Sequence, residues 1–379
     1  MRGFSQPAST PLTATYKPSV TPISPSHTPD TWSGSIHDMD LVHCIQPDSS
    51  TTQTNPAGLY VTESLLLGCS SLSHTELPPH VSPIAASDSH VSYTDPLYIY
   101  TLVQPTGLPN YLSARIPLPH ALNMPVWRQL LCHYSDSLLC DFLEFGWPIN
   151  YSRSHWPVLC LQNHASALAY PQQIQDYMAQ EVSHQAMLGP FNTPPFPIYQ
   201  INPLMTKSKK GCDTKKWVIV DLSWPHGFSV NDGISKDVYL GEPVTLKYPT
   251  VDTLVSLILQ HGPGCLLYSV DLARAYRQWR SDPLDWPLLG IMWDNSFYFD
   301  ISIPFGLRPG AMFCQRVTDS IRHILQQSYI TVVNYIDDFA AIFTPDKADS
   351  HFHSLRSLLQ QLGVCESTDK ATAPHTTMT

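Results

Sequence analysis

The chain has 379 residues and a formal net charge of −10. This length leaves room for two or three domains, and the acidic balance, taken over the whole chain, argues against a nucleic-acid-binding protein. The nine cysteines are scattered singly without metal-ligand spacing, which predicts a reduced intracellular protein. The sequence shows no signal-peptide pattern and no long apolar run, so we expect neither secretion nor a membrane partner.

The charge is distributed unevenly along the chain. Residues 1–100 carry two basic and eight acidic side chains, whereas residues 201–280 carry ten basic and seven acidic ones. Residues 281–379 are acidic again, with six basic and eleven acidic side chains. The only basic section therefore precedes an acidic end, which is compatible with a metal site or with a solvated surface.

The first 30 residues hold six prolines and ten serines or threonines, a composition that disfavours regular structure. Such a segment buries too little apolar surface to offset the entropy lost on ordering. We therefore predict a disordered arm over roughly 1–90, in which TESLLLGCSSL forms at most a transient helix.

Residues 91–190 are predicted to form a helical extension. Apolar side chains recur at helical spacings from Trp127 to Leu139, which predicts one helix. A second helix is expected from about 171 to 187, where a Gly-Pro pair follows it. Taken alone, both are ordinary packing helices.

The basic section contains two lysine-bearing strands around a tight turn. Lys207, Lys209 and Lys210 precede the turn Gly-Cys-Asp. Lys215 and Lys216 follow it and lead into the strand WVIVDLS. The pattern predicts a β-hairpin that presents ammonium groups to phosphate, and it is also compatible with a merely solvated hairpin.

Three aspartates lie at the ends of predicted strands. A buried strand, CLLYSV, ends at Asp271, and VVNYIDDFAAIF places Asp337 and Asp338 between two short apolar runs. Neither flanking strand can bury two charges, so we expect a hairpin with the acids at its tip. If the two strands are sheet neighbours, the three carboxylates meet. Because no His or Cys accompanies them, hard divalent cations with oxygen ligands fit best.

Several motifs resemble a known family. In chain order, VDLARAYRQW, IPFGLRPGAMFCQRVTD and NYIDDFAAIF are similar to the first three palm motifs of reverse transcriptases. DLSWPHGFSVNDGIS and the upstream ARIPLPHALNMPVWRQLL are similar to polymerases of tyrosine-recombinase (DIRS-type) retrotransposons. The resemblance covers about residues 110–379.

This resemblance implies an α+β fold of the right-hand polymerase class. Residues 191–379 would form fingers and palm, the palm being a ferredoxin-like sheet with helices. The family continues into a thumb and a ribonuclease H domain, whereas this sequence stops at Thr379. We therefore expect a product truncated before the thumb.

The activity implied by the resemblance is that of an RNA-directed DNA polymerase. A primer 3′-hydroxyl would attack the α-phosphate of a deoxynucleoside triphosphate, with two Mg²⁺ ions, or Mn²⁺, on Asp271, Asp337 and Asp338. The expected partners are an RNA or DNA template with its primer and the deoxynucleoside triphosphate. The alternatives are a non-catalytic nucleic-acid-binding remnant and a passive scaffold whose arm binds other proteins.

The motifs also imply roles for neighbouring residues. Tyr276 matches an aromatic gate under the sugar that favours deoxynucleotides, with plain core packing as the alternative. Phe305 and Gly306 match the loop that lines the nucleotide pocket. Arg308 would face phosphate or template, or be an idle surface charge. Gln315 matches a template-strand position, or is a surface glutamine.

The nucleotide's phosphates have further expected partners. Lys370 matches a lysine near the leaving pyrophosphate. Trp217 departs from the family pattern, because it stands where an arginine usually grips the triphosphate. Lys210, Lys215 or Lys216 would cover part of that role, although a lysine lacks the planar guanidinium fork.

Overall fold

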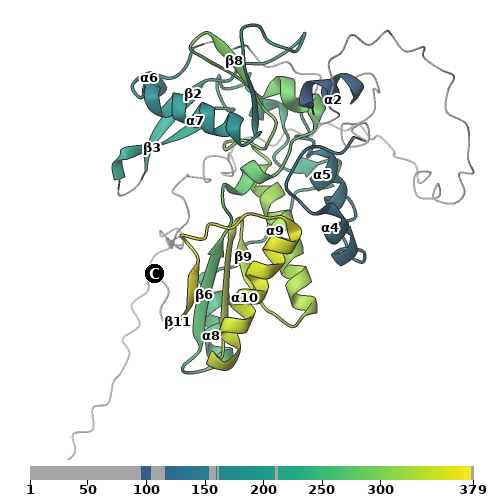
Figure 1. Ribbon diagram of the computed structural model, residues 1–379, viewed down its shortest axis with the longest axis vertical. Helices are drawn as coiled ribbons and strands as arrows, with labels where there is room; N and C mark the ends of the chain where they lie inside the picture. Colours follow the sequence, from purple (N-terminus) through teal and green to yellow (C-terminus); the bar gives the residue numbers. More distant parts are fainter. Residues whose placement is uncertain (1–94, 104–115, 153–158, 160–161, 210–211, 377–379) are drawn as a thin grey trace, which may run out of the picture. The chain divides into compact units, whose positions relative to one another are not determined.

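The structure is a computed structural model that describes residues 95–103, 116–152, 159, 162–209 and 212–376. The predicted arm over 1–90, with its transient helix, lies outside the described residues. The described part mixes helices with small antiparallel sheets, as the α+β prediction expects (Figure 1). None of the helices in it is both long and apolar enough to cross a membrane.

The helices and strands have the following bounds. The described helices are α2 (Pro96–Val103), α4 (Met124–Leu130), α5 (Leu139–Phe145), α6 (Ala165–Leu168), α7 (Pro171–Ser183), α8 (Val251–His261), α9 (Gly310–Gln327) and α10 (Pro345–Leu362). The described strands are β1 (Met187–Phe191), β2 (Leu204–Lys209), β3 (Cys212–Val220), β4 (Val238–Tyr239), β5 (Glu242–Pro243), β6 (Leu266–Asp271), β7 (Gly290–Trp293), β8 (Ser296–Asp300), β9 (Val333–Tyr335), β10 (Asp338–Phe343) and β11 (Thr372–His375).

The stretch predicted as one helix from Trp127 to Leu139 is two helices, α4 and α5, with a turn between them. The connecting residues are largely polar, and Asp136 among them accepts two hydrogen bonds, of 2.8 and 2.9 Å, from the Arg316 guanidinium. The prediction of a single helix was wrong, because the spacing of apolar residues does not reveal the polar turn between α4 and α5. The ion pair between Asp136 and Arg316 fixes that turn to α9.

The second predicted helix, α7, begins at Pro171 but ends at Ser183 instead of 187. Met187 opens β1, which pairs antiparallel with β8, so that Met187 lies opposite Asp300. A strand partner more than a hundred residues away thus shortens the helix. Local spacing could not reveal that competition.

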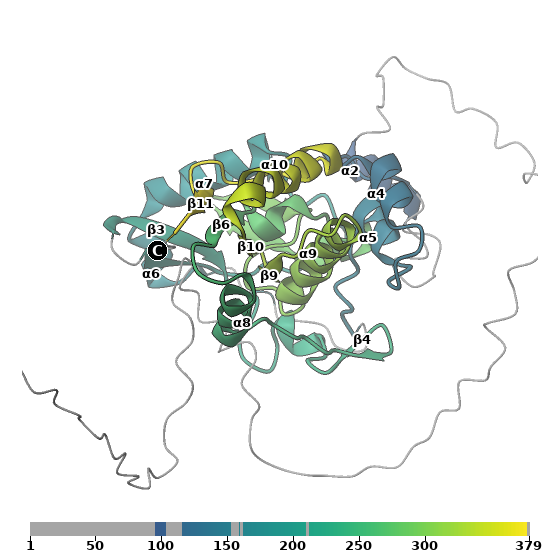
Figure 2. The same cartoon turned by 90° about the horizontal axis from the view of Figure 1, so that it is seen from below.

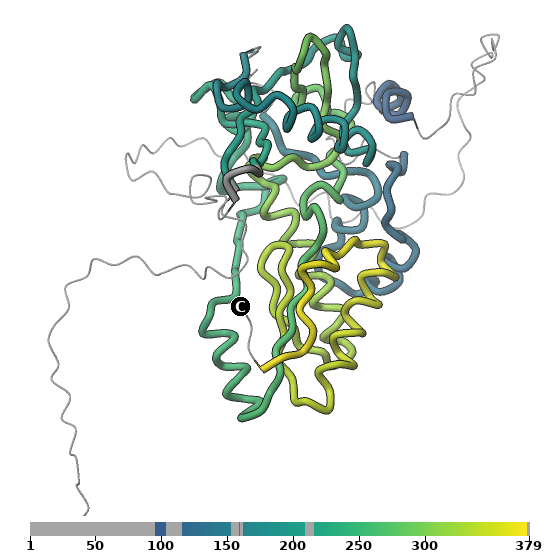
Figure 3. The backbone as a smooth tube through the Cα atoms, turned by 60° about the vertical axis from the view of Figure 1, so that its left-hand side comes forward, coloured from purple at the N-terminus to yellow at the C-terminus, as the bar shows by residue number. Residues whose placement is uncertain are grey.

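A four-stranded antiparallel sheet, with the order β11-β6-β10-β9, forms the centre of the part that carries the acids. Figure 2 shows α9 and α10 on one side of this sheet and α8 on the other. The last strand, β11, returns to lie beside β6 (Figure 3). The helix before β6 is α8, whose first turn is fixed by a capping box between Thr250 and Thr253.

The core packs large rings between this sheet, α9 and the helical extension. Trp147, which follows α5, stacks on Phe313 of α9 with ring centroids 4.6 Å apart. Trp127 and Trp279 are also fully buried in the same cluster. Burying each such side chain contributes about 1.5–3 kcal/mol. Part of the extension is therefore packed into the same core as the acid-bearing sheet.

Candidate active site

Asp271 and Asp338 lie directly opposite each other on β6 and β10. Opposite residues of an antiparallel pair project from the same face of a sheet. The turn residue Asp337 is held next to them, because its carbonyl accepts a hydrogen bond of 3.0 Å from the amide of Leu272. The predictions that the two strands are neighbours and that the acids lie at the tip of a hairpin are confirmed.

The two opposed acids lie on the sheet face opposite α10. Tyr268, on β6, packs its ring against Phe352 of α10 with centroids 5.4 Å apart. Side chains alternate along a strand, so Asp271, three positions later, lies on the opposite face. Asp271 is 6% exposed, and Asp338 is half-buried.

The acids outnumber the cation beside them. Lys370 donates from Nζ to Oδ2 of Asp271, as an ion pair. Burial, together with the Asp271 carboxylate, raises the pKa of Asp337 to about 7. Burial and the two neighbouring carboxylates raise the pKa of Asp338 to about 8. Asp337 and Asp338 are therefore held partly protonated near neutral pH, and a bound cation would favour their charged forms.

The donor set fits a hard divalent cation. It offers carboxylate oxygens only, and Oδ1 of Asp271 is buried without a hydrogen-bond partner in the described structure. The side chains are nevertheless not arranged to coordinate an ion in this conformation. Among the described residues, no three His, Cys, Asp or Glu side chains lie close enough together to hold one. A cation at Asp271 would have to compete with the ammonium of Lys370.

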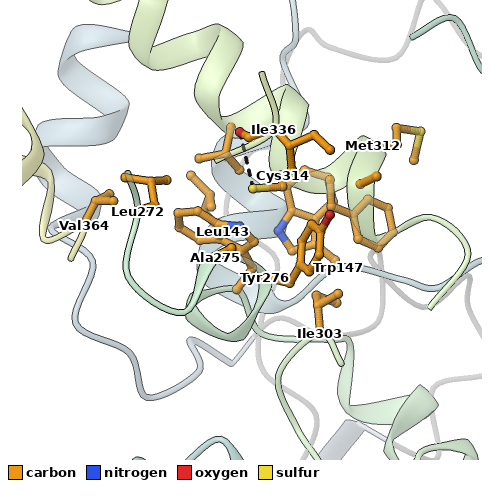
Figure 4. Packing of buried hydrophobic residues seen from close by; sticks show 14 of the residues in the cluster. Leu143, Trp147, Leu272, Ala275, Tyr276, Ile303, Met312, Cys314, Ile336 and Val364 are labelled. Atoms are coloured by element: carbon orange, nitrogen blue, oxygen red, sulfur yellow. Dashed lines mark hydrogen bonds between the residues drawn. The ribbon is translucent and has the colours of Figure 1, made fainter. Parts of the chain in front are cut away.

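The backbone of the acid-bearing turn is gripped by α9. Ile336 has a φ of 54°, a left-handed conformation that is costly for a β-branched residue. Its amide donates to Oε1 of Gln315 at 2.8 Å, and its carbonyl accepts from Oγ1 of Thr318 at 2.8 Å. The thiol of Cys314 also points at that carbonyl, at 3.6 Å (Figure 4). Three side chains of one helix thus fix the residue before Asp337.

Gln315 is 2% exposed, and its amide nitrogen also donates to Asp319 at 3.0 Å. The alternative of a surface glutamine is therefore wrong. The side chain is buried in this conformation, and its contact with a template strand stays a prediction. Thr318 and Asn334, which hydrogen-bond to each other at 2.9 Å, were not singled out from the sequence. The sequence carries a pattern that could have indicated Thr318. Gln315, Thr318 and Asp319 are polar residues three and four positions apart, which places them on one face of a helix.

Tyr276 lies in a short 3-10 turn, Ala275–Gln278, just after β6. Its ring is 8% exposed and meets Phe305 edge-on, with centroids 5.1 Å apart. Figure 4 draws it among buried side chains that include Trp147 and Ile303. Burial, above all, raises its pKa well above the ordinary value for tyrosine. The ring is packed as the core alternative expects, and the gate remains a prediction.

The predicted pocket loop, 304–310, is held by Asn231, which is 1% exposed and was not singled out from the sequence. Its Nδ2 donates to the carbonyl of Gly306 at 2.7 Å, and its Oδ1 accepts from the amide of Arg308 at 2.8 Å. Gly306 has a φ of +96°, and a Cβ there would stand 2.9 Å from the carbonyl oxygen of Val220. A larger residue would therefore force this loop away from β3.

Arg308 is not an idle surface charge. It is half-buried, and its guanidinium donates to the carbonyl of Ile234 at 2.7 Å. Part of its donor set therefore holds the backbone next to Asn231. A contact with phosphate or template stays a prediction for its remaining donors.

The basic hairpin forms as predicted, with β2 and β3 paired antiparallel. Lys210, and the side chain of Lys215, lie outside what the structure describes. Lys216 donates to Oγ of Ser208 at 2.7 Å and lies 4.9 Å over the ring of Tyr170. Its ammonium is therefore directed to the segment between α6 and α7.

Trp217 lies on the other face of β3 from Lys216, because side chains alternate along a strand. Ile219, two positions later on the face of Trp217, has a methyl group 4.0 Å from the point that a Cβ of Gly306 would occupy. Trp217 therefore shares the face of β3 on which Ile219 approaches the 304–310 loop, and its match to the family's arginine position stays a prediction.

No protein-family model matches the chain, and no curated protein matches it in sequence. Among solved structures, it is similar to the prototype foamy virus protease-reverse transcriptase, with a TM-score of 0.44 and 17% identity over 73% of this chain and 33% of that one. It is also similar to the foamy viral protease-reverse transcriptase in complex with double-stranded DNA, with a TM-score of 0.46 and 14% identity over 76% and 46% of the two chains. A third similar structure is the foamy viral protease-reverse transcriptase in complex with an RNA/DNA hybrid. Its TM-score is 0.45 and its sequence identity 14%, over 77% of this chain and 35% of that one.

The chain spans about a third to a half of the length of the solved structures it matches.

Proposed function

We propose that the chain is an RNA-directed DNA polymerase of a retrotransposon of the tyrosine-recombinase type. The observation that carries this proposal is the pairing of Asp271 with Asp338, next to Asp337 in a turn that α9 grips. Residues 191–379 would be its fingers and palm, 91–190 a helical extension and 1–90 an arm.

Asp271, Asp337 and Asp338 would hold two Mg²⁺ ions. When bound, the ions supply a lowered pKa at the primer hydroxyl and charge neutralisation at the leaving pyrophosphate. The chain's own contribution is position. The grip on Ile336 fixes the turn that carries Asp337, and Ser367 donates its amide to the carbonyl of Asp271 at 2.7 Å. That bond anchors the segment that carries Lys370 beside the acids, where an ammonium can meet a developing negative charge.

The nucleotide would bind between the 304–310 loop and β3. Phe305 and Gly306 would line its pocket, with Tyr276 beneath the sugar and Arg308 facing phosphate or template. A ring at 276 leaves no room for a 2′-hydroxyl. Tyr276→Val is therefore expected to raise ribonucleotide incorporation relative to deoxynucleotides, whereas Tyr276→Phe, which keeps the ring, should not.

The proposal is tested by primer extension on a poly(rA) template with an oligo(dT) primer, dTTP, and Mg²⁺ or Mn²⁺. The full chain should extend the primer only when the metal is present, and Asp337→Asn should abolish extension. Asp349→Asn, at an exposed position on α10, is the matched control and should extend normally. Equal extension by the Asp337→Asn variant would reject the assignment.

A non-catalytic nucleic-acid-binding remnant is the second candidate. It is favoured by the ion pair between Lys370 and Asp271, which occupies an oxygen that a metal would need. It predicts nucleic-acid binding without extension in either metal. The same assay, read together with binding of the primer–template, separates the two candidates.

A further inference from the structure

The loop between β3 and the short turn Asn231–Gly233 exposes a set of rings. Trp224 is 42% exposed and Phe228 is 53% exposed, and His226 between them is also exposed. We call these three residues the aromatic loop. Exposed aromatic side chains gathered within a few residues mark binding surfaces more often than isolated ones do.

The aromatic loop is fixed at its beginning. Asp221 accepts from the amide of Ser223 at 3.1 Å and pairs with Nε2 of His164 at 2.9 Å. The His164 ring in turn lies edge-on to Trp224, with centroids 5.9 Å apart, and Trp224 meets His226 at 5.6 Å. The indole is thus supported from two sides by imidazole rings while nearly half of it faces solvent.

The end of the loop is fixed as well. Asp232 accepts from both the amide and the hydroxyl of Ser229, at 3.1 and 2.6 Å. Phe228 donates its amide to the carbonyl of Pro225 at 3.0 Å, which closes the loop on itself. A ring presented by an anchored loop loses little conformational entropy when a ligand stacks on it.

The loop is also continuous with the candidate nucleotide pocket. Asn231 joins the two, because its Nδ2 donates both to Oγ of Ser223, at the start of the loop, and to the carbonyl of Gly306. A strand that reaches the 304–310 loop would therefore pass next to the aromatic loop. The polymerase proposed above must hold unpaired bases in this vicinity before they are copied.

We propose that the aromatic loop is a stacking platform for single-stranded nucleic acid, on which unpaired bases pack against Trp224 and Phe228. This proposal deepens the function proposed above and rests on it for the identity of the strand as template. Base stacking on aromatic rings is tolerant of sequence, since every base presents a flat π-face. The ligand is therefore a run of unpaired nucleotides and not a particular sequence.

The test uses the full chain without divalent metal, primer or nucleotide, and follows the fluorescence anisotropy of a labelled single strand of about 16 nucleotides. Trp224→Ala and Phe228→Ala should each weaken binding by about 5-fold to 150-fold. Trp224→Phe, which keeps a ring, should recover most of the loss. Tyr329→Ala removes a ring that is 92% exposed at the far end of α9, and it should leave binding unchanged.

An abasic strand of the same length separates stacking from phosphate contacts. It should bind weakly to the parent chain, and the alanine variants should not weaken it further. Equal losses on the normal and abasic strands would overturn the proposal, as would unchanged binding of the normal strand. A change of oligomeric state in the alanine variants, without loss of strand binding, would assign the rings to a protein contact instead.

The assay contains no metal and no triphosphate, so it does not depend on catalysis. A chain that binds the strand through these rings but never extends a primer would refute the polymerase and keep the platform. A chain that extends primers, and whose strand binding is unchanged in Trp224→Ala and Phe228→Ala, would support the polymerase and refute the platform.

Discussion

Two groups of buried charges in the described structure differ in how they are balanced. The first, the acidic cluster, consists of Asp271, Asp337 and Asp338, with Lys370 on one oxygen. The second, the arginine cluster, consists of Glu181, Asp300, Arg274 and Arg277. Two guanidinium groups meet two carboxylates in the arginine cluster, whereas one ammonium serves three carboxylates in the acidic cluster.

The arginine cluster joins three segments of the chain. Arg277 is almost fully buried and donates to Glu181 of α7 at 2.9 Å and to Asp300 of β8 at 2.5 Å. Arg274 adds a bond of 2.6 Å to the same Glu181. Burial raises the pKa of Asp300 to about 6 even though the Arg277 charge opposes the shift. A balanced cluster of this kind holds elements together and leaves no charge for a ligand.

Charge balance separates structural charges from candidate functional ones. Burying a charge without a partner is expensive, so a fold that brings acids together without matching cations either holds them protonated or binds a cation there. The acidic cluster has three carboxyl groups and one ammonium, and its acids lie on the sheet face opposite α10. We therefore expect the two clusters to respond differently when their charges are changed.

The largest effect is expected from Arg277→Met. It would leave the carboxylates of Glu181 and Asp300 buried with only Arg274 as a cation, which typically costs about 3–5 kcal/mol. Urea unfolding should show this loss. Arg274→Met is the control, because Arg274 is 30% exposed and should cost no more than about 1 kcal/mol. Equal losses would mean that burial does not set the cost of removing an arginine from this cluster.

A large gain is expected from Trp217→Arg, which adds a cation on the face of β3 that meets the 304–310 loop. A charge-assisted contact contributes roughly 1.5–3 kcal/mol, so nucleotide use should improve about 10-fold to 150-fold. The gain should appear in the apparent affinity for triphosphate, measured by steady-state primer extension, while metal dependence stays the same. Ser208→Arg, which adds a cation at the exposed position of β2 that pairs with Lys216, is the control. No gain would mean that a neighbouring lysine already fills the role.

A smaller effect concerns pH. Asp338 has a pKa of about 8 in the folded chain against an ordinary 3.8, so its stabilising contribution is complete below about pH 4 and is lost as the pH rises toward 8. The free energy of unfolding should fall over that window by about 1–2 kcal/mol, once solvent screening is allowed for. Asp338→Asn should reduce the fall, and Asp349→Asn should not. Added Mg²⁺ should also reduce the fall. If the free energy of unfolding fell equally in Asp338→Asn and in the presence of Mg²⁺, the raised pKa of Asp338 could not be its cause.

The smallest effect is expected from Lys370→Met. It removes the ammonium that competes for Oδ2 of Asp271, in a partly exposed ion pair of the kind that contributes about 0.2–1 kcal/mol. Mn²⁺ should therefore bind up to about 5-fold more tightly, as measured by electron paramagnetic resonance of the free ion. Lys347→Met, at an exposed position on α10, should not change the affinity for Mn²⁺. Weaker binding in Lys370→Met would show that the lysine organises the acids.

Much of the acid site could be predicted from the sequence. The short apolar runs and the break at two adjacent acids predicted β6 and the hairpin of β9 and β10, and a cation shared by the three carboxylates required the two to be neighbours. The grip on Ile336 could not be foreseen in the same way. It depends on Gln315 and Thr318 facing a turn that follows them by about twenty residues, and only the packing of α9 against β9 brings them there.

Periodicity and local charge are properties of neighbouring residues, so the kinds of element, the order of the motifs and the excess of acids at two strand ends could be predicted from the sequence. Which of the charges are balanced depends on the three-dimensional fold. Glu181 meets Arg277 across 96 positions of the chain and Asp300 meets it across 23, while Lys370 reaches Asp271 through the pairing of β11 with β6. The physical reason is that a buried charge is compensated by whatever the fold places within a few ångströms of it, and separation along the chain does not report that distance.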